Sequence, residues 1–111
     1  MNDIWTLPSG EWIVYSDEEK IIKDFKSLAD LVVVTSYHGI IKRHRAVQFK
    51  FPDREDILRY VCHMAGFEYR RVVSLLKHPG ISYSRLFGEV VYQPPLFAAS
   101  DPGRKGKGTG L

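Results

Sequence analysis

A cluster of basic side chains lies near the middle of the chain, between two segments that are expected to form strands. Residues 42–45 read Lys-Arg-His-Arg, and aromatic residues occur close by at Tyr37 and Phe49. Basic side chains neutralise the phosphates of a nucleic acid, and an exposed ring can stack on a base. This pattern predicts a nucleic-acid contact through Lys42, Arg43 and Arg45. The alternative interpretation is a solvated hairpin rim without a ligand.

A second group of basic residues lies in residues 58–77, where apolar residues surround a glycine. Cys62 supplies a small side chain, and Gly66 follows it four positions later. Glycine adopts positive φ without strain, and compact contact residues let two helices cross closely, so this spacing predicts a helix pair joined by a tight turn. The apolar positions of the pattern are Val61, Ala65, Phe67, Val72 and Leu75.

This segment resembles the helix-turn-helix signature of bacterial and phage DNA-binding proteins. The resemblance implies that the second helix lies in a major groove and presents its polar residues to DNA. Val73 and Leu76 widen the apolar surface of that helix, so ordinary packing of two structural helices is the alternative. The residues that the resemblance assigns to the DNA contact are Arg70, Arg71, Ser74 and Lys77, with Glu68 on the same helix.

A short peptide near the C-terminal end carries a different kind of signal. Residues 93–97 read Gln-Pro-Pro-Leu-Phe. This peptide resembles the motif by which bacterial polymerases and repair proteins dock on the sliding clamp, in which a glutamine and a Leu-Phe pair are the anchors. The resemblance implies a replication partner bound through Gln93, Leu96 and Phe97. The alternative is that Leu96 and Phe97 fold back onto the domain as an apolar staple.

Other side chains that could do chemistry are not arranged for it. The four histidines have no paired metal-ligand spacing. The acidic residues at the two predicted helix starts are all explained by the helix dipole, so no carboxylate pair for acid-base catalysis can be identified. We therefore expect a protein that is not an enzyme and needs no metal or cofactor. The histidines are His38, His44, His63 and His78.

Composition predicts one small globular domain. The 111 residues are 44% hydrophobic and 26% charged, and the net charge of +3 is only mildly basic. Cys62 is the single cysteine, so no internal disulfide can form, and a reducing cytoplasm is the expected compartment. No apolar run approaches the length of a membrane span, and the first residues lack the features of a secretory signal.

The elements that must position these residues can be read from periodicity. We expect strands at 11–15, 31–37 and 40–51, the second covered on both faces because it is continuously apolar. Ser16 and Glu19 form a capping-box pattern at the start of the first helix, and Asp53 is the expected N-cap of the second. A third helix is expected at 68–77 and a last, short strand at 89–92, whereas 81–87 is ambiguous.

The resulting order is β-α-β-β-α-α-β. This order predicts an α+β fold, a variant of the ferredoxin-like arrangement, with an antiparallel sheet and helices on one face. The domain spans residues 1–92, and residues 93–111 form a flexible tail rich in Pro, Gly and Lys. The expected core residues are Trp12, Val14, Ile21, Phe25, Val33, Val47, Phe49, Leu58 and Val61.

Taken together, these patterns favour a non-enzymatic accessory protein of bacterial or phage type that associates with nucleic acid. Its tail would dock on the DNA sliding clamp. The alternative is a small protein-binding regulator or inhibitor that uses its sheet or hairpin and has no affinity for nucleic acid.

Overall fold

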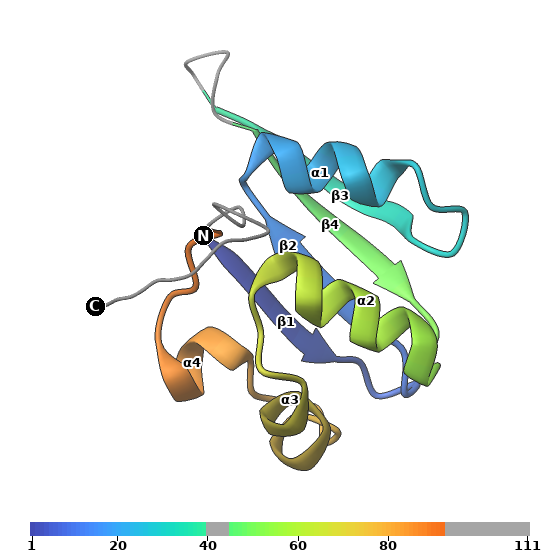
Figure 1. Ribbon diagram of the computed structural model, residues 1–111, viewed down its shortest axis with the longest axis vertical. Coiled ribbons are helices and arrows are strands. Elements are labelled where there is room, and N and C mark those ends of the chain that lie inside the picture. The colour runs from blue at the N-terminus through green and yellow to red at the C-terminus, as the bar shows by residue number, and fades with distance from the viewer. Residues whose placement is uncertain (40–44, 93–111) are drawn as a thin grey trace, which may run out of the picture.

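The computed structural model describes residues 1–39 and 45–92. A four-stranded sheet has the strand order β1-β2-β4-β3, and every neighbouring pair is antiparallel. Figure 1 shows the arrangement of the elements. They are β1 (Asn2–Thr6), β2 (Trp12–Ser16), α1 (Glu19–Lys26), β3 (Val32–His38), β4 (Arg45–Phe51), α2 (Glu55–Ala65), α3 (Tyr69–Leu75) and α4 (Tyr83–Phe87).

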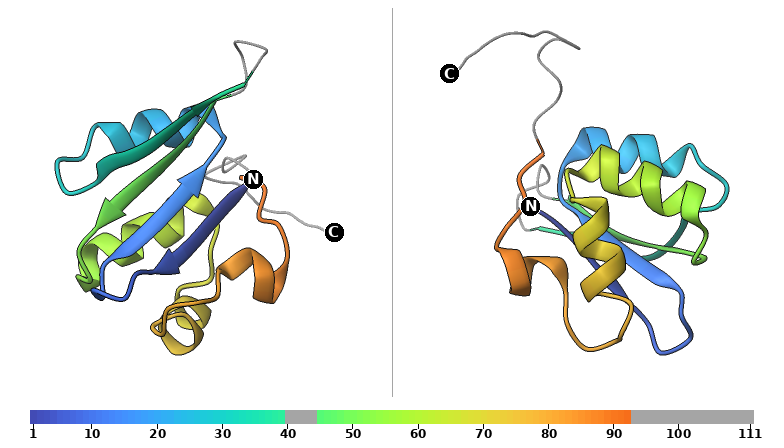
Figure 2. Two further views of the ribbon diagram at one scale, coloured as in Figure 1. Left: turned by 180° about the vertical axis from the view of Figure 1, so that it is seen from behind. Right: turned by 60° about the horizontal axis from the view of Figure 1, so that its bottom comes forward.

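Helices α1 and α2 lie on the same face of the sheet, and the main core lies between them and the strands (Figure 1). Phe25 of α1 meets Phe49 of β4 edge-on, with ring centroids 5.6 Å apart. Seen from behind, none of the helices in residues 1–39 and 45–92 covers the other face of the sheet (Figure 2). The predicted α+β architecture, with an antiparallel sheet and helices on one face, is therefore confirmed.

The predicted order of elements was wrong at both ends of the chain. Residues 2–6 form a strand that was not expected, and β1 takes the sheet edge beside β2. The strand expected at 89–92 does not form, and Val90 makes only an isolated bridge to Asn2. Strand β2 pairs with β1 on one side and with β4 on the other, so a strand at 89–92 could not pair with β2.

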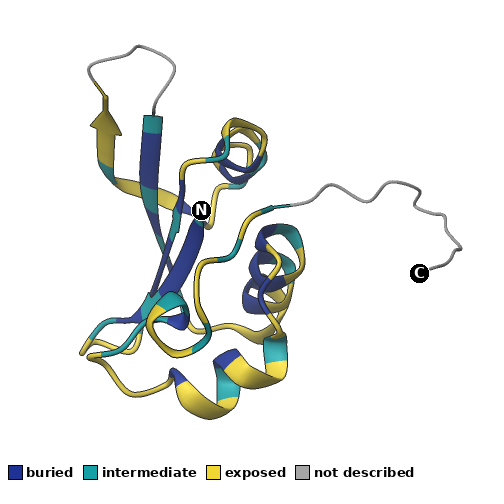
Figure 3. Cartoon of the chain, turned by 90° about the vertical axis from the view of Figure 1, so that its left-hand side faces the viewer, coloured by how far each residue is buried: buried dark blue, intermediate teal, exposed yellow. Residues whose placement is uncertain are grey.

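Strand β3 is the opposite edge of the sheet, and the expectation that it is covered on both faces was wrong. Val32 is 54% exposed, and Val33 and Val34 are each 43% exposed. The register shifts between Val33 and Thr35, so the strand carries an irregularity at this point. Figure 3 shows β3 as an exposed strand beside the largely buried β4. Of the expected core residues, Val33 alone is not buried.

Both predicted helix caps were wrong by one or two residues. Helix α1 begins at Glu19 after an N-cap at Glu18, and the Ser16 hydroxyl accepts from the Glu18 amide at 3.0 Å. Helix α2 has Arg54 at its N-cap. The Asp53 carboxylate instead accepts from the Trp12 indole N–H at 3.0 Å, so it ties the second strand to the entry of α2.

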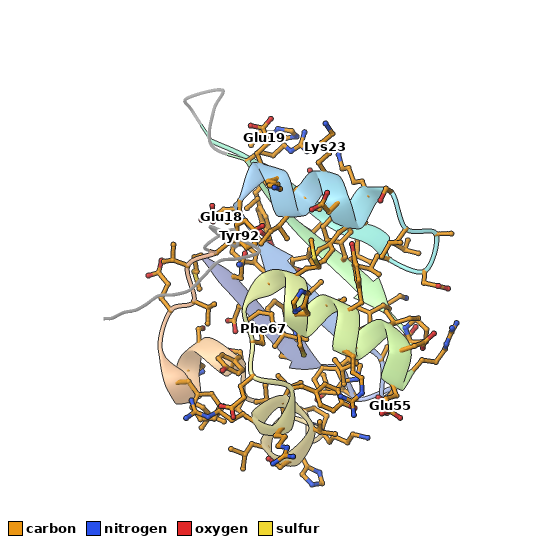
Figure 4. The ribbon with its side chains drawn as sticks, in the orientation of Figure 1. Glu18, Glu19, Lys23, Glu55, Phe67 and Tyr92 are labelled. Atoms are coloured by element: carbon orange, nitrogen blue, oxygen red, sulfur yellow. The ribbon has the colours of Figure 1, made fainter. Side chains whose placement is uncertain are left out.

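Helix α3 is shorter than the predicted span of 68–77, and its end is held by the sheet. The Thr6 hydroxyl donates to the Leu76 carbonyl at 2.6 Å. Phe67, which follows α2 (Figure 4), packs on Tyr83 of α4 with ring centroids 4.9 Å apart. The Glu68 amide donates to the Tyr83 hydroxyl at 3.2 Å, which satisfies an otherwise free donor at the start of α3. Among the described residues, no helix is long and apolar enough to cross a membrane.

Candidate nucleic-acid interface

The start of β4, which carries Arg45, and helix α3 lie at opposite ends of the described part of the molecule (Figures 1 and 2). Arg45 pairs with His38 at one end of β4, and Phe51 pairs with Trp12 at the other. Seven residues of strand span about 20 Å. Leu76, at the end of α3, is bound to Thr6 beside Trp12, so α3 lies at the far end. Arg45 and α3 are therefore not adjacent to each other.

The turn between α2 and α3 has the conformation that the helix-turn-helix pattern predicts. Gly66 has φ +85° and caps α2 in the left-handed region. One apolar position was wrong, because Leu75 is 50% exposed and Leu76 is buried in its place. The other apolar positions are buried, namely Val61, Ala65, Phe67 and Val72, together with the small residue Cys62.

Intramolecular partners engage most of the polar side chains that α3 was expected to offer to DNA. Arg71 Nε lies 2.8 Å from Glu68 Oε1, and its guanidinium lies 4.6 Å from the centroid of the Phe87 ring. Ser74 donates its hydroxyl to the Arg70 carbonyl at 2.7 Å. Lys77 Nζ lies 3.6 Å from an Asp53 oxygen. These contacts are exposed, so they reduce the charge available to phosphates without removing it.

The other end of the molecule carries a hollow on the uncovered face of the sheet. Its volume is about 320 Å³, and its walls come from β2, β3 and β4. Tyr37 is 48% exposed there, and Gln48 donates to its hydroxyl at 3.4 Å. Phe49, the other ring of the predicted basic hairpin, is fully buried in the core and cannot stack on a ligand. The lining includes Tyr15, Asp17, Tyr37, His38, Arg45 and Ala46.

The register of the sheet explains why this hollow exists. Tyr37 lies opposite Ala46 on one side, and continuing the β2–β4 register by one residue places Asp17 opposite Ala46 on the other. Directly opposed side chains point to the same face of a sheet. The short side chain of Ala46 therefore leaves a depression between the larger residues of the neighbouring strands.

Electrostatics in the hollow are mixed. Arg45 lines the hollow, whereas the Asp17 carboxylate is ion-paired with the ammonium group of Met1. Burial, with smaller contributions from Asp17 and Tyr37, raises the pKa of the Tyr15 phenol above its ordinary value. Tyr15 is therefore neutral at physiological pH and acts as a hydrogen-bonding ring in the wall.

Sequence reasoning identified Tyr37 and Arg45 but missed the rest of this site. Tyr15 lies 22 residues before Tyr37 in the chain. The two come together because β2 and β3 both pair with β4. Ala46 carries no chemical group that a motif search could find. Tyr15 and Ala46 belong to the site because of their positions in the strand pairing, and the sequence alone did not predict that pairing.

Several predicted residues lie outside the described ranges. Lys42 and Arg43 fall between residues 39 and 45, and the docking anchors Gln93, Leu96 and Phe97 follow residue 92. Their roles stay predictions.

Residues 1–39 and 45–92 contain no group of three or more His, Cys, Asp or Glu side chains that could hold a metal ion. Comparison of the chain with protein-family models, curated proteins and solved structures gave no significant match.

Proposed function

We propose that this protein is a nucleic-acid-associated accessory protein whose nucleic-acid contact lies at the β3–β4 end of its uncovered sheet face. One observation carries the proposal: Tyr37 is exposed on that face, and Arg45 lines the same hollow. The sequence between β3 and β4 includes the basic residues Lys42 and Arg43. Basic groups next to an exposed ring supply both phosphate attraction and base stacking.

The two basic groups, which come from different segments of the sequence, can be compared in a charge-matched test. One variant replaces Lys42, Arg43 and Arg45 by Gln, and the other replaces Arg70, Arg71 and Lys77 by Gln. Each removes three positive charges, so the net charge is the same in both. Affinity for labelled DNA and RNA is then measured from about 50 to 200 mM salt, the range over which phosphate contacts weaken strongly.

We expect the first variant to lose most of the affinity. The slope of log affinity against log salt concentration should become shallower by about two to three, because three phosphate contacts are lost. The second variant should bind more nearly like the wild type, since Arg71 and Lys77 already have acidic partners. A larger loss in the second variant would place the contact on α3 and contradict the proposal. Absence of binding at low salt would reject nucleic-acid association altogether.

The proposal includes a replication partner, the DNA sliding clamp, bound through Gln93, Leu96 and Phe97. This part is supported by the resemblance of residues 93–97 to the docking motif. Replacing Leu96 and Phe97 by Ala should abolish capture of a purified clamp and leave the melting temperature unchanged. A fall of several degrees in melting temperature, with capture retained, would support the staple instead.

A protein-binding regulator without nucleic-acid affinity is the second candidate function, and the exposed edge of β3 favours it. Charged side chains and proline commonly protect an exposed edge strand from pairing. Residues 32–37 contain neither. An added strand from a partner would pair with such an edge. Val34→Lys should weaken capture of a protein partner, whereas Leu75→Lys, at a similarly exposed position on α3, should not.

A further inference from the structure

The hollow at Ala46 has a shape that restricts the kind of nucleic acid it accepts. Its volume of about 320 Å³ is near the lower limit for small-molecule sites, so it suits one planar group rather than a whole nucleotide chain. Its walls include the phenol rings of Tyr15 and Tyr37, which come from different strands. A site of this size between two aromatic walls is suited to a flat heterocycle.

A base inside a duplex cannot enter such a site. Its two faces are covered by neighbouring base pairs, and exposing one requires unstacking. In a single strand the face of a base is available, and stacking on an aromatic side chain is tolerant of sequence because every base has a π-face. We infer that the Ala46 hollow receives one unpaired base of a single-stranded nucleic acid, stacked on Tyr37, with Arg45 near the adjoining phosphate.

This inference rests on the proposed function and adds the form of the ligand. Three features of the described residues support it. Tyr37 is 48% exposed, so its ring is accessible to a ligand. Arg45 lines the same hollow. The face has no helix over it, so a strand can reach the hollow from solvent (Figure 2).

The test measures the anisotropy of labelled oligonucleotides of about ten nucleotides, within the site sizes of single-strand binders. The full chain is titrated against single-stranded DNA, single-stranded RNA and the corresponding DNA duplex. Ala46→Ile fills the hollow without changing the charge, and isoleucine is compatible with a strand. Tyr37→Leu removes the ring, Tyr37→Phe keeps it, and Val32→Ala changes an exposed residue of the same strand away from the hollow.

We expect both single strands to bind more tightly than the duplex. Tyr37→Leu and Ala46→Ile should each weaken single-strand binding by about 5- to 150-fold, the range that loss of one stacked base produces. Tyr37→Phe and Val32→Ala should bind like the wild type. Thermal melting checks that each variant is folded, and the two Tyr37 variants decide the test if Ala46→Ile is not.

Two results would overturn the inference while leaving the proposed function standing. One is a preference for the duplex, and the other is unchanged single-strand binding by Tyr37→Leu. In both cases the proposed function stands if replacing Lys42, Arg43 and Arg45 still lowers the affinity. Failure of all three nucleic acids to bind would reject both the inference and the proposed function.

Discussion

Asp3 holds together two parts of the chain that are far apart in sequence. Its carboxylate is 7% exposed, and Oδ1 accepts from the amides of Ile4 and Ser84, each at 2.9 Å. Oδ2 accepts from the Ser84 hydroxyl at 2.6 Å. Ser84 is the second residue of α4, so Asp3 satisfies a donor that a helix normally pairs with its own N-cap side chain.

Asp3→Ala should therefore lower the free energy of unfolding by about 2–4 kcal/mol, because it removes charge-assisted hydrogen bonds and leaves donors without partners. Urea denaturation followed by circular dichroism measures this. Ser84→Ala is the matched control, since it removes the hydroxyl bond and keeps the two amide bonds. It should cost less than half as much. Equal losses in the two variants would contradict a capping role for Asp3.

Cys62 should make stability depend on pH in the alkaline range. Burial raises the pKa of its thiol from an ordinary 9.0 to about 12. The unfolded chain releases this proton near pH 9 while the folded protein keeps it, so unfolding is favoured as pH rises. The stabilisation is complete below pH 9 and is lost between pH 9 and 12, at up to about 1.4 kcal/mol per pH unit.

The comparison of wild type with Cys62→Ala isolates this effect from the titration of tyrosines. The variant should be less stable at every pH because of the lost volume, but its stability should fall less steeply above pH 9. Urea unfolding at pH 8, 9 and 10.5 supplies the slopes, those values being chosen to bracket the unfolded thiol's titration. Parallel slopes for the two proteins would be inconsistent with a buried, protonated thiol.

At the scale of elements, local patterns predicted helices and their faces better than they predicted strands and their neighbours. Ile21, Ile22 and Phe25 recur at helical spacing, and all three are fully buried. Residues 31–34 are continuously apolar, which predicts burial, yet the strand order places β3 at an edge. Burial of a strand depends on which strands flank it, and that is decided by pairings across the whole chain.

The same reason explains what could be predicted of the candidate site. Arg45 and Tyr37 belong to one local segment and were found from their types and spacing. Tyr15 and Ala46 matter because of the rows they occupy in the sheet, and β1 was missed because its first residues are polar. Asn2 and Asp3 are buried through contacts with residues 63 and 81 positions later in the chain, respectively.

The turn between α2 and α3 offers a test of how the segment after α4 packs. A Cβ added at Gly66 would lie 3.3 Å from Val90 Cγ1, and φ is +85°. At Gly10, φ is +93° but nothing lies within 4 Å. Gly66→Ala should therefore be more destabilising than Gly10→Ala, which has only the backbone cost of about 1–2 kcal/mol.

Thermal or urea unfolding of both glycine variants gives the difference. Adding Val90→Ala to Gly66→Ala should recover the part of the loss that comes from the contact, so that the double variant approaches Gly10→Ala. If Val90→Ala brings no recovery, residue 90 does not rest on this turn as the structure places it.

For the molecule as a whole, the two edges of the sheet differ in how far other segments cover them. The β1 edge is anchored to α4 through Asp3 and is bridged by Val90. The β3 edge is exposed over three consecutive valines. Any added strand, from a partner or from another copy, therefore has access to β3 and meets the protein's own segments at β1.

The bridge between Asn2 and Val90 suggests that the same sheet can be built from a chain with a different connectivity. The Asn2 amide donates to the Val90 carbonyl at 2.7 Å, and only residues 91, 92 and 1 would separate the pair if Tyr92 were joined to Met1. Three residues are a common length for a hairpin loop. A circular permutant closed there and opened at Gly10, in the β1–β2 turn, would have β1 as its last strand.

Its elements would then run β-α-β-β-α-α-α-β, which differs from the order predicted from the sequence only by α4. We expect the permutant to fold to the same sheet, with a spectrum of backbone amide resonances like that of residues 1–92, because domains tolerate new termini in exposed turns when the old ones are adjacent. A permutant that fails to fold would mean that β1 and β2 must pair early as a hairpin. If the permutant folds, the order in which the chain connects the elements, rather than the set of packed elements, distinguishes this protein from the arrangement predicted from its sequence.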